Sequence, residues 1–376
     1  MMQTVNPMLR KDRFKLGLFS ANCSGGMTLT KAPERWDASW DHNLRLAHMA
    51  DEAGLDFLLP VARWIGFPGS EITFMKSVLE TTTWAAGLLA STRDIAVIST
   101  VHTAANNPVV VAKQVATLDQ IGHGRAGINI VAGWFKPEYE ALGLTLPDEH
   151  TVRYAYAQEW YDIIQKLWAS EERFDWNGVN FKLKDVHSDP KPMRGSVPII
   201  NAGGSKEGRD FALRNANFLF TPAIDLQRST AEVAALKEQA AQGGRAVDVV
   251  TFSHVVCRPT EQEAKDFYKY YVAQSDWEAV DYALKMQFAT ALSFPHDLLA
   301  QIRERFAAGH GGFPLTGSPE QVADGIEQLY RAGFAGTTLS FVNYVDEFPF
   351  FARSVLPILE ARGIRTVRPE DGRVAA

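Results

Sequence analysis

Short apolar runs alternate along the chain with segments in which apolar residues recur every three to four positions. The runs predict buried strands, and the periodic segments predict amphipathic helices. Eight strands are predicted, at residues 15–20, 56–60, 95–100, 125–131, 197–201, 218–221, 249–256 and 336–342. The predicted helices are residues 40–54, 78–90, 108–122, 152–168, 207–215, 229–242, 261–273, 319–332 and 347–362.

Eight strands that alternate with helices predict one closed α/β barrel of the (βα)8 or TIM type, which would take up residues 1–376 as a single domain. The main alternative, a doubly wound sheet, would place a Gly-rich phosphate loop directly after the first strand. Residues 22–27 (NCSGGM) contain glycines but lack the G-x-G-x-x-G pattern. Three irregular stretches, near residues 134–150, 171–193 and 278–312, are predicted to be insertions in the barrel.

Composition narrows the class of protein further. The formal charge is −6 and no long basic run occurs, which argues against nucleic acid as a main partner. The apolar stretches are shorter than the ~20 residues that a membrane span needs. Cys23 and Cys257 lie far apart, and the first 15 residues contain no apolar signal core. We therefore expect a cytoplasmic protein with free thiols.

Asn129 interrupts the apolar run of the fourth predicted strand. In a (βα)8 barrel the reactive groups lie at the carboxyl ends of the strands, where an inward amide must find a hydrogen-bond partner. Asn129 is thus either a structural amide or a group that binds a heterocycle edge or a reactive intermediate. Thr103 follows the third strand, so we expect it beside Asn129, either as an ordinary loop residue or as a second polar contact.

The segment NAGGSKEGR, residues 201–209, joins a late strand to a helix. Gly203 and Gly204 allow the backbone to approach a ligand closely, and Ser205 lies where the free N–H groups of the helix begin. This position is a recurrent phosphate site in barrels. Arg153 and Tyr154 open the long helix after the first insertion, where Arg153 is either a phosphate clamp or one half of an exposed ion pair.

The sequence contains few other signals of catalysis. No HExxH, no His/Cys pair at metal-ligand spacing and no GxSxG occurs, so no metal site is predicted. His102 and His254 fall near strand ends and are candidates for proton transfer or for ordinary packing. Aromatic residues at the predicted mouth form either a substrate wall or part of the core: Trp36, Trp64, Trp134, Phe341 and Tyr344. This pattern favours chemistry carried out by a bound cofactor.

Several longer segments together resemble one family, the bacterial-luciferase-like flavin monooxygenases. They are similar above all to its dimethylsulfone monooxygenase and pyrimidine monooxygenase group. The similar segments are NCSGGM with TKAPERWD, VAKQVATLDQIGHGRAGINIVAGWFKPEYEALG, RYAYAQEWYDIIQKLW, NAGGSKEGRDFALRNANFLF and FVNYVDEFPFFARSVLPIL. Together they extend over nearly the whole chain.

The resemblance implies a two-component monooxygenase that uses reduced FMN (FMNH2) and O2. A separate NAD(P)H-dependent flavin reductase would supply FMNH2, and the enzyme would be a homodimer or homotetramer. The implied substrate is a small organosulfur compound or an N-heterocycle, oxidised through a flavin peroxide. The resemblance leaves open whether oxygen adds at flavin N5 or at C4a.

By position, the resemblance also implies roles for single residues. Ala62 and Arg63 would contact the flavin, Asn129 would face its ring, and Glu138 would lie in the loop beyond. Its phosphate would be held by Arg153, Tyr154 and Ser205, with Gly204 beside them. Thr103 and Asn129 would place O2 at the flavin.

Two further interpretations remain. A deazaflavin-dependent oxidoreductase would use the same barrel and phosphate segment, and a flavin-binding protein without turnover would keep only the binding site. The insertions at 134–150 and 278–312 are the expected lids that exclude water, with hinge freedom at Gly309, Gly311 and Gly312.

Overall fold

Eight parallel strands close into a barrel in the computed structural model, which describes residues 6–67, 72–287 and 296–366. Each strand pairs with the next in the order β1, β2, β3, β4, β7, β8, β9, β11, and β11 pairs back with β1. The barrel strands are β1 (Lys15–Phe19), β2 (Phe57–Leu59), β3 (Ala96–His102), β4 (Ala126–Val131), β7 (Ile199–Asn201), β8 (Phe218–Phe220), β9 (Asp248–Cys257) and β11 (Gly336–Ser340). The predicted (βα)8 barrel is confirmed.

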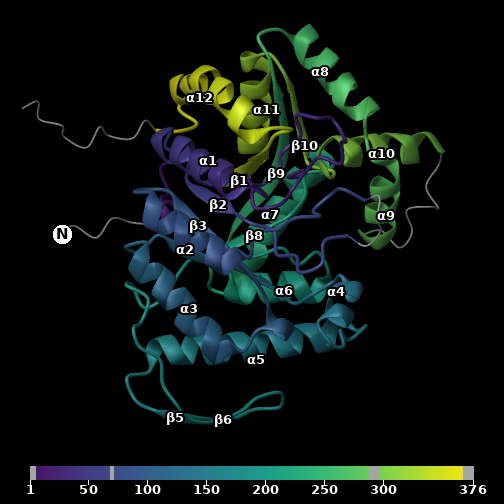
Figure 1. Ribbon diagram of the computed structural model, residues 1–376. Helices are drawn as coiled ribbons and strands as arrows, with labels where there is room; N and C mark the ends of the chain where they lie inside the picture. The colour runs from purple at the N-terminus through teal and green to yellow at the C-terminus, as the bar shows by residue number, and fades with distance from the viewer. Residues whose placement is uncertain (1–5, 68–71, 288–295, 367–376) are drawn as a thin grey trace, which may run out of the picture.

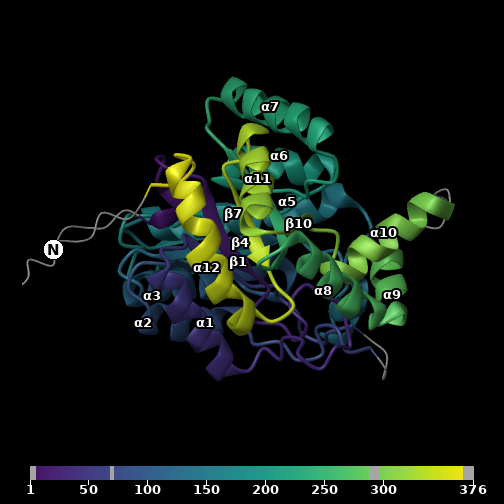
Figure 2. The ribbon, with the colours of Figure 1, turned by 90° about the horizontal axis from the view of Figure 1, so that it is seen from above.

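Helices surround the strands on the outside of the barrel, as the view along a perpendicular direction shows (Figure 2). The helices that follow the barrel strands are α1 (Trp40–Glu52), α2 (Thr81–Ser91), α3 (Pro108–Ile121), α5 (His150–Ala169), α6 (Lys206–Asn215), α7 (Leu226–Gln242), α8 (Glu261–Ala273) and α12 (Tyr344–Ala361). A further helix, α11 (Pro319–Arg331), precedes β11. These bounds agree with the predicted helices to within a few residues.

Strand β10 (Phe313–Gly317) is a ninth parallel strand that the apolar pattern does not predict. It pairs with the last five residues of β9, from Ser253 to Cys257, whereas β8 pairs with the first three. Because β11 occupies the other side of β9 from Val250 to His254, β10 must lie on the β8 side, beyond its end. It thus extends the barrel wall at the carboxyl end.

The three predicted insertions contain regular elements. The segment at 171–193 holds an antiparallel hairpin, β5 (Phe174–Asn177) and β6 (Lys182–Val186), that lies against α5 far from the barrel (Figure 1). The segment at 134–150 holds α4 (Lys136–Ala141), and that at 278–312 holds most of α9 (Trp277–Gln287) and all of α10 (His296–Gly309). Figure 1 shows α4, α9 and α10 at the same end of the barrel.

Alternation along each strand separates the inside of the barrel from the outside. Inward residues such as Phe57, Ile98, Ile200, Phe218 and Val250 belong to one buried apolar cluster that fills the barrel. Leu18, Val97 and Leu339, one position away, pack in the cluster under the helices. An inward position near a strand end therefore faces the mouth.

The opposite end of the barrel is closed by a buried ion-pair cluster. Asp56 is fully buried and pairs with Arg13 at 2.7 Å and with Arg365 at 2.8 Å. Arg365 also donates to the carbonyl oxygens of Gly54 and Phe14. The cluster fixes the chain beyond α12 against the entry to β2.

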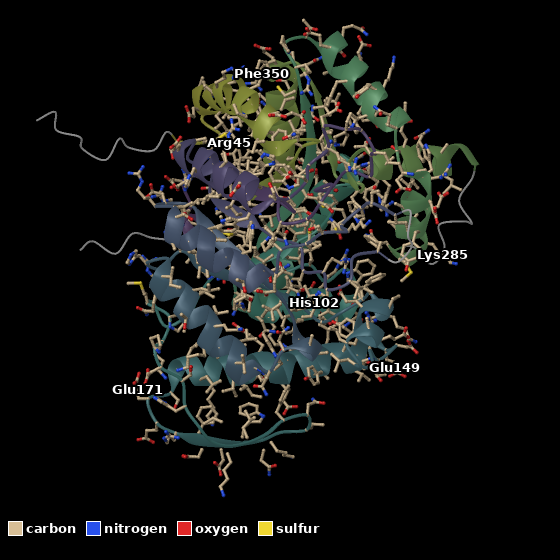
Figure 3. All side chains as sticks on the ribbon, in the orientation of Figure 1. Arg45, His102, Glu149, Glu171, Lys285 and Phe350 are labelled. Atoms are coloured by element: carbon tan, nitrogen blue, oxygen red, sulfur yellow. The ribbon has the colours of Figure 1, made fainter. Side chains whose placement is uncertain are left out.

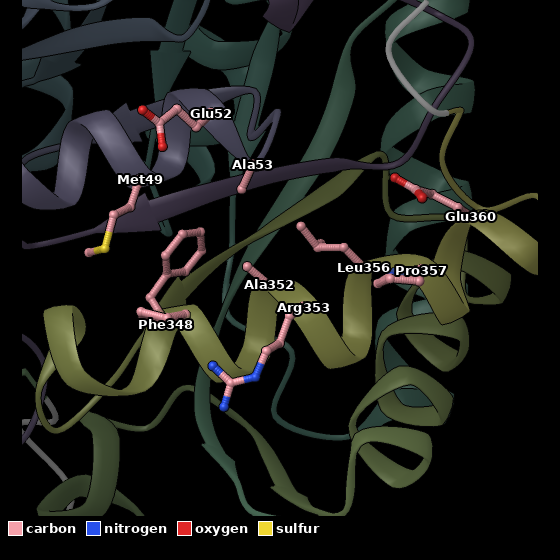
Figure 4. Close-up of a pocket in the computed structure, with 10 residues that line it drawn as sticks. Met49, Glu52, Ala53, Phe348, Ala352, Arg353, Leu356, Pro357 and Glu360 are labelled. Atoms are coloured by element: carbon pink, nitrogen blue, oxygen red, sulfur yellow. The ribbon is translucent and has the colours of Figure 1, made fainter. Parts of the chain in front are cut away.

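A surface groove of about 460 Å³ lies between α1 and α12 (Figure 4). Met49, Phe348 and Leu356 give it an apolar floor, and Glu52 and Glu360 also line it. It lies on the outer surface of the barrel and not at its mouth.

Among the described residues, no helix is long and apolar enough to cross a membrane. The single-domain organisation stays a prediction.

Candidate active site

Asn129 lies on the inward face of β4 near the carboxyl end, with 8% of its surface exposed. Its Nδ2 donates to Oγ1 of Thr100, the residue opposite on β3, at 3.2 Å. Thr100 Oγ1 in turn donates its proton to the carbonyl oxygen of Pro60 at 2.6 Å. Thr100 Oγ1 can therefore only accept from the amide, which fixes the side-chain orientation. Asn129 Oδ1 is left buried without a hydrogen-bond partner among the described residues.

Thr103 is fully buried at the first position of a short 3-10 turn that follows β3 (Thr103–Ala105). Its Oγ1 also has no hydrogen-bond partner in the described part of the chain. Buried polar atoms without partners are uncommon, because each costs about 1–3 kcal/mol. Two of them lie at the ends of the neighbouring strands β3 and β4. The Asn129 amide bonds Thr100, and the expected place of Thr103 beside Asn129 stays a prediction.

A buried ion-pair cluster lies beside these residues, between the β2 and β4 ends. Glu138 on α4 is 0% exposed, lies 3.6 Å from Arg63 and accepts from the backbone N–H of Trp64 at 2.6 Å. The Arg63 guanidinium contacts the faces of Trp134 and Phe135, at 4.7 and 5.0 Å from the ring centroids. Glu138 thus lies in a helix and not in a loop, and it fixes the Arg63 segment. Ala62, one residue earlier, is buried as well.

His102 at the end of β3 joins this cluster, with Nδ1 3.5 Å from Glu138 Oε2 and its ring stacked on Tyr139. Figure 3 shows His102 in the interior of the molecule, among packed side chains. Burial lowers the pKa of His102 to about 3, and the nearby charge of Arg63 adds to the shift. The imidazole is therefore neutral at physiological pH, and its contact with Glu138 is not an ion pair. It can hold a proton in position but does not carry a positive charge.

The turn between β7 and α6 forms a close-packed cradle. Asn201 fixes it by accepting from Gly203 N–H at 3.0 Å and donating to the Ile130 carbonyl oxygen at 2.8 Å. A Cβ on Gly203 would lie 2.5 Å from Gly208 Cα and 2.6 Å from the Tyr154 hydroxyl oxygen, so only glycine fits. The position of a Cβ on Gly204 is open. The structure therefore brings Tyr154 against the glycine turn, as expected for a shared binding site.

Ser205 is the N-cap of α6, and its Oγ accepts from Gly208 N–H at 3.1 Å. The first turn of a helix has N–H groups without partners inside the helix, and such groups can bind an anion. The Glu207 carboxylate also lies in this turn, in contact with the Ser205 hydroxyl and with its own N–H. Arg153 does not form the exposed ion pair that was its alternative. It is 9% exposed and donates to the carbonyl oxygens of Gly133 at 2.7 Å and Asp148 at 3.3 Å. Arg153 Nε is buried without a hydrogen-bond partner among the described residues.

The five candidate aromatic residues fall into two groups. Trp134 lies over the Arg63 guanidinium. Trp64, the residue that follows Arg63 in the sequence, is 46% exposed. Trp36, Phe341 and Tyr344 are at most 1% exposed, and the Tyr344 ring contacts those of both Trp36 and Phe341. The second group is core in this conformation. A role for any of the five in a substrate pocket stays a prediction.

The mouth has a second lining that sequence reasoning did not single out. Phe19, Phe220 and Phe252 come from β1, β8 and β9, and their ring centroids lie 5.3–5.9 Å apart. Each of these rings lies two positions after an inward-facing residue of its strand. This spacing is the sequence signal that would identify them. His254 follows Phe252 on the same face of β9 and is 4% exposed. In the described part of the chain, no group of three His, Cys, Asp or Glu side chains could hold a metal ion.

These features suit a flavin mononucleotide. The cradle between Tyr154 and Ser205 offers helix N–H groups to a phosphate, and the partnerless Asn129 Oδ1 and Thr103 Oγ1 offer hydrogen bonds to a polar ring edge. A model of the luciferase-like monooxygenases matches residues 14–336.

The chain belongs to the luciferase-like monooxygenase family.

Known relatives match this chain over nearly their whole length. The chain is 29% identical over 356 residues to the FMNH2-dependent dimethylsulfone monooxygenase of Pseudomonas fluorescens, covering 93% of this chain and 96% of that protein. It is also 29% identical over 354 residues to pyrimidine monooxygenase RutA of Acinetobacter baylyi, covering 93% and 95%.

Among solved structures, the riboflavin lyase RcaE with modified FMN and riboflavin superposes with a TM-score of 0.83 at 23% identity, covering 94% of this chain and 92% of that one. This likeness concerns the fold. The family predicted from the sequence, and with it the assignment as a monooxygenase, is confirmed.

Proposed function

We propose that the protein is the oxygenase of a two-component system that uses FMNH2 and O2 to oxidise a small organosulfur compound or N-heterocycle. The observation that carries the proposal is the pair of buried polar atoms without partners, Asn129 Oδ1 and Thr103 Oγ1, at adjacent strand ends of a luciferase-like barrel. The FMNH2-dependent relative of similar length supports FMN as the cofactor.

The phosphate of FMN would be held by the Ser205 end of α6, with the Tyr154 hydroxyl and Arg153 beside it. The ring would rest against β3 and β4, near Ala62, Arg63 and Asn129. Reduced flavin supplies the two electrons that activate O2 for transfer of one oxygen atom to the substrate. The chain's own residues bind, orient and shield this chemistry.

Asn129 is suited to a reduced ring in particular. Because Thr100 takes the amide N–H, the atom left for the ligand is the acceptor Oδ1. A reduced isoalloxazine carries an N–H at N5, where the oxidised form has only a lone pair. If the flavin binds with this edge toward Asn129, the acceptor Oδ1 would favour the reduced form, and Thr103 Oγ1 would be available to donate a hydrogen bond to oxygen.

Arg63 and Glu138 give this side of the mouth a rigid, dry wall. Their charges compensate each other, and the rings of Phe67, Trp134 and Phe135 surround the guanidinium. Exclusion of water protects an activated oxygen species from wasteful release as H2O2. We propose α4, α9 and α10 as the elements that complete this exclusion. A flavin reductase and a homodimer or homotetramer remain part of the proposal.

The test supplies the purified protein with FMN, NADH, a flavin reductase and ¹⁸O2, and offers it sulfones, sulfonates and pyrimidines in turn. We expect a substrate-dependent product that carries one ¹⁸O atom. Tight FMN binding with no oxygenation of any compound would favour a flavin-binding protein without turnover. Stronger binding of a deazaflavin than of FMN would favour the alternative cofactor.

A further inference from the structure

The groove between α1 and α12 is bordered by three charged side chains that have no opposite charge to pair with in the chain. Glu52 borders it on α1, and Arg353 and Glu360 border it on α12. Within residues 6–67, 72–287 and 296–366, none of the three forms a salt bridge or a side-chain hydrogen bond. The Cζ atom of Arg353 lies over the Phe350 ring, 5.0 Å from the centroid. Figure 4 shows the Arg353 side chain directed away from both carboxylates.

A neighbouring arginine differs in this respect. Arg362, at the C-cap of α12, pairs with Asp324 and Glu327 of α11 at 2.7 and 2.8 Å. An exposed ion pair contributes at most about 1 kcal/mol by itself, so unpaired charges alone do not indicate a contact surface. In this groove they surround apolar side chains, and a partner that covers it would remove apolar surface from water and supply countercharges at the same time.

The outer side of α12 forms a ridge beside the groove. Pro349, Arg353 and Pro357 follow one another at four-residue spacing, so they lie in one row along the helix. We call this row the α12 ridge. Its two prolines have no rotamer freedom to lose when they are covered. The next row at the same spacing lines the groove itself: Phe348, Ala352, Leu356 and Glu360. Ridges of this kind pack into the grooves of a facing helix pair.

The signs of the three charges indicate what covers the groove. A uniformly basic partner would bring like charge to Arg353, and a uniformly acidic partner would bring like charge to Glu52 and Glu360. A second copy of this chain carries both signs in the matching arrangement. A two-fold axis brings such a patch against itself, so that Arg353 of each copy can face the two carboxylates of the other.

We propose that the groove between α1 and α12 is an interface between two copies of this chain. The α12 ridge of each copy lies in the groove of the other, and Arg353 pairs with Glu52 and Glu360 across the interface. This inference deepens the proposed function by naming the contact surface of the homodimer, or of one dimer within a homotetramer. Because the groove does not lie at the mouth of the barrel, both mouths stay open.

The first test measures the mass of the protein in solution by light scattering after size exclusion, without FMN or substrate. We expect the mass of two or four chains for the wild type and half of that mass for Arg353→Glu, because its new carboxylate would face Glu52 and Glu360 of the second copy. Lys269→Glu makes the same change of charge at an exposed position of α8 and should keep the wild-type mass. A single-chain mass for the wild type, or an unchanged mass for Arg353→Glu, would overturn the proposal.

A second test restores the pairing with opposite charges. The double variant Glu52→Arg, Glu360→Arg should also have half the wild-type mass, because three cations would then meet their own copies. An equal mixture of this variant with Arg353→Glu should regain the wild-type mass, since opposite charges face each other again at both contacts. A mixture that stays at half mass would contradict the pairing, provided that far-UV circular dichroism shows both variants folded. Oxygenation of a substrate is measured separately, so failure of the interface and failure of the proposed function are distinguishable.

Discussion

At the scale of single residues, hydrogen bonds determine which atom each side chain presents to a ligand. The bond from Thr100 to Pro60 joins two residues that are not themselves proposed ligand contacts, yet it forces Asn129 to present Oδ1. In the same way, Asn201 holds the turn in which Gly203 and Ser205 lie. The site is thus prepared by residues that do not themselves contact the ligand.

The first prediction concerns Asn129. Asn129→Ala should lower oxygenation at least tenfold, because an acceptor placed for the reactive ring is lost, while the Kd for FMN changes less than about threefold since the phosphate cradle is intact. Product formation and FMN titration measure the two effects. Wild-type oxygenation in this variant would remove Asn129 from the mechanism.

The second prediction compares two adjacent glycines. Gly203→Ala should lower Tm and weaken FMN binding, because its Cβ would meet Gly208 and Tyr154. Gly204→Ala meets open space in the protein, so Tm should hold while FMN affinity falls if the phosphate approaches the backbone there. Thermal melts and FMN titration of both variants decide; unchanged FMN affinity in both would place the phosphate elsewhere.

At the scale of elements, Arg305 connects the lid to the barrel. It projects from α10 and binds carbonyl oxygens in the β8–α7 connection and in its own terminal turn. Arg303, on the same helix, instead forms an exposed pair with Asp281 of α9. One arginine thus attaches the lid to the barrel and the other ties its two helices together.

The third prediction follows from this difference. Arg305→Lys should raise the share of O2 released as H2O2, because an ammonium cannot reach three separate carbonyl oxygens and the lid would close less often. Arg303→Lys is the matched control and should change that share little. Peroxide assays against product yield measure it, and equal coupling in both variants would show that Arg305 does not govern closure.

The elements differ in how far the sequence predicts them. The eight barrel strands are predictable because buried parallel strands are near-continuous apolar runs. Strand β10 (FPLTG) is not, since Pro314 and Gly317 interrupt it. Hairpin β5–β6 is hidden by the exposed Asp175 and Asn177 that alternate with its packed aromatic residues.

Asn129 is visible as a polar residue in an apolar run, whereas Thr100 and the pairing of His254 with Ser340 depend on strand register and appear only in the structure.

At the scale of the whole molecule, both ends of the barrel depend on buried polar clusters. The mouth holds neutral histidines, and the opposite end holds Asp56 between Arg13 and Arg365. The apolar core accounts for the barrel itself, and these clusters account for how its ends are closed.

The fourth prediction concerns the closed end. Arg365→Ala should lower the free energy of unfolding by about 3 kcal/mol, because it leaves Asp56 Oδ2 with less compensation in a buried site. Arg362→Ala, which removes surface pairs with Asp324 and Glu327, should cost at most about 1 kcal/mol. Urea denaturation measures both, and equal losses would contradict the role given to the cluster.

The fifth prediction is a pH dependence of stability. His102 and His254 have pKa values lowered to about 3 in the folded state, so the unfolded chain binds their protons first. Stability is therefore full above about pH 6.5 and falls as pH drops toward 3, by up to about 1.4 kcal/mol per pH unit for each histidine. Urea denaturation between pH 7.5 and 5 should show a shallower dependence for His254→Leu than for the wild type, and an equal dependence in the two proteins would contradict this role of His254.

The arrangement of the flavin against β3 and β4 is the central claim, and a crystal structure of the protein with FMN tests it most directly. The account predicts the isoalloxazine edge within hydrogen-bond distance of Asn129 Oδ1 and the phosphate on the N–H groups at Ser205. A ring bound on the His254 side, or a phosphate bound away from α6, would contradict it.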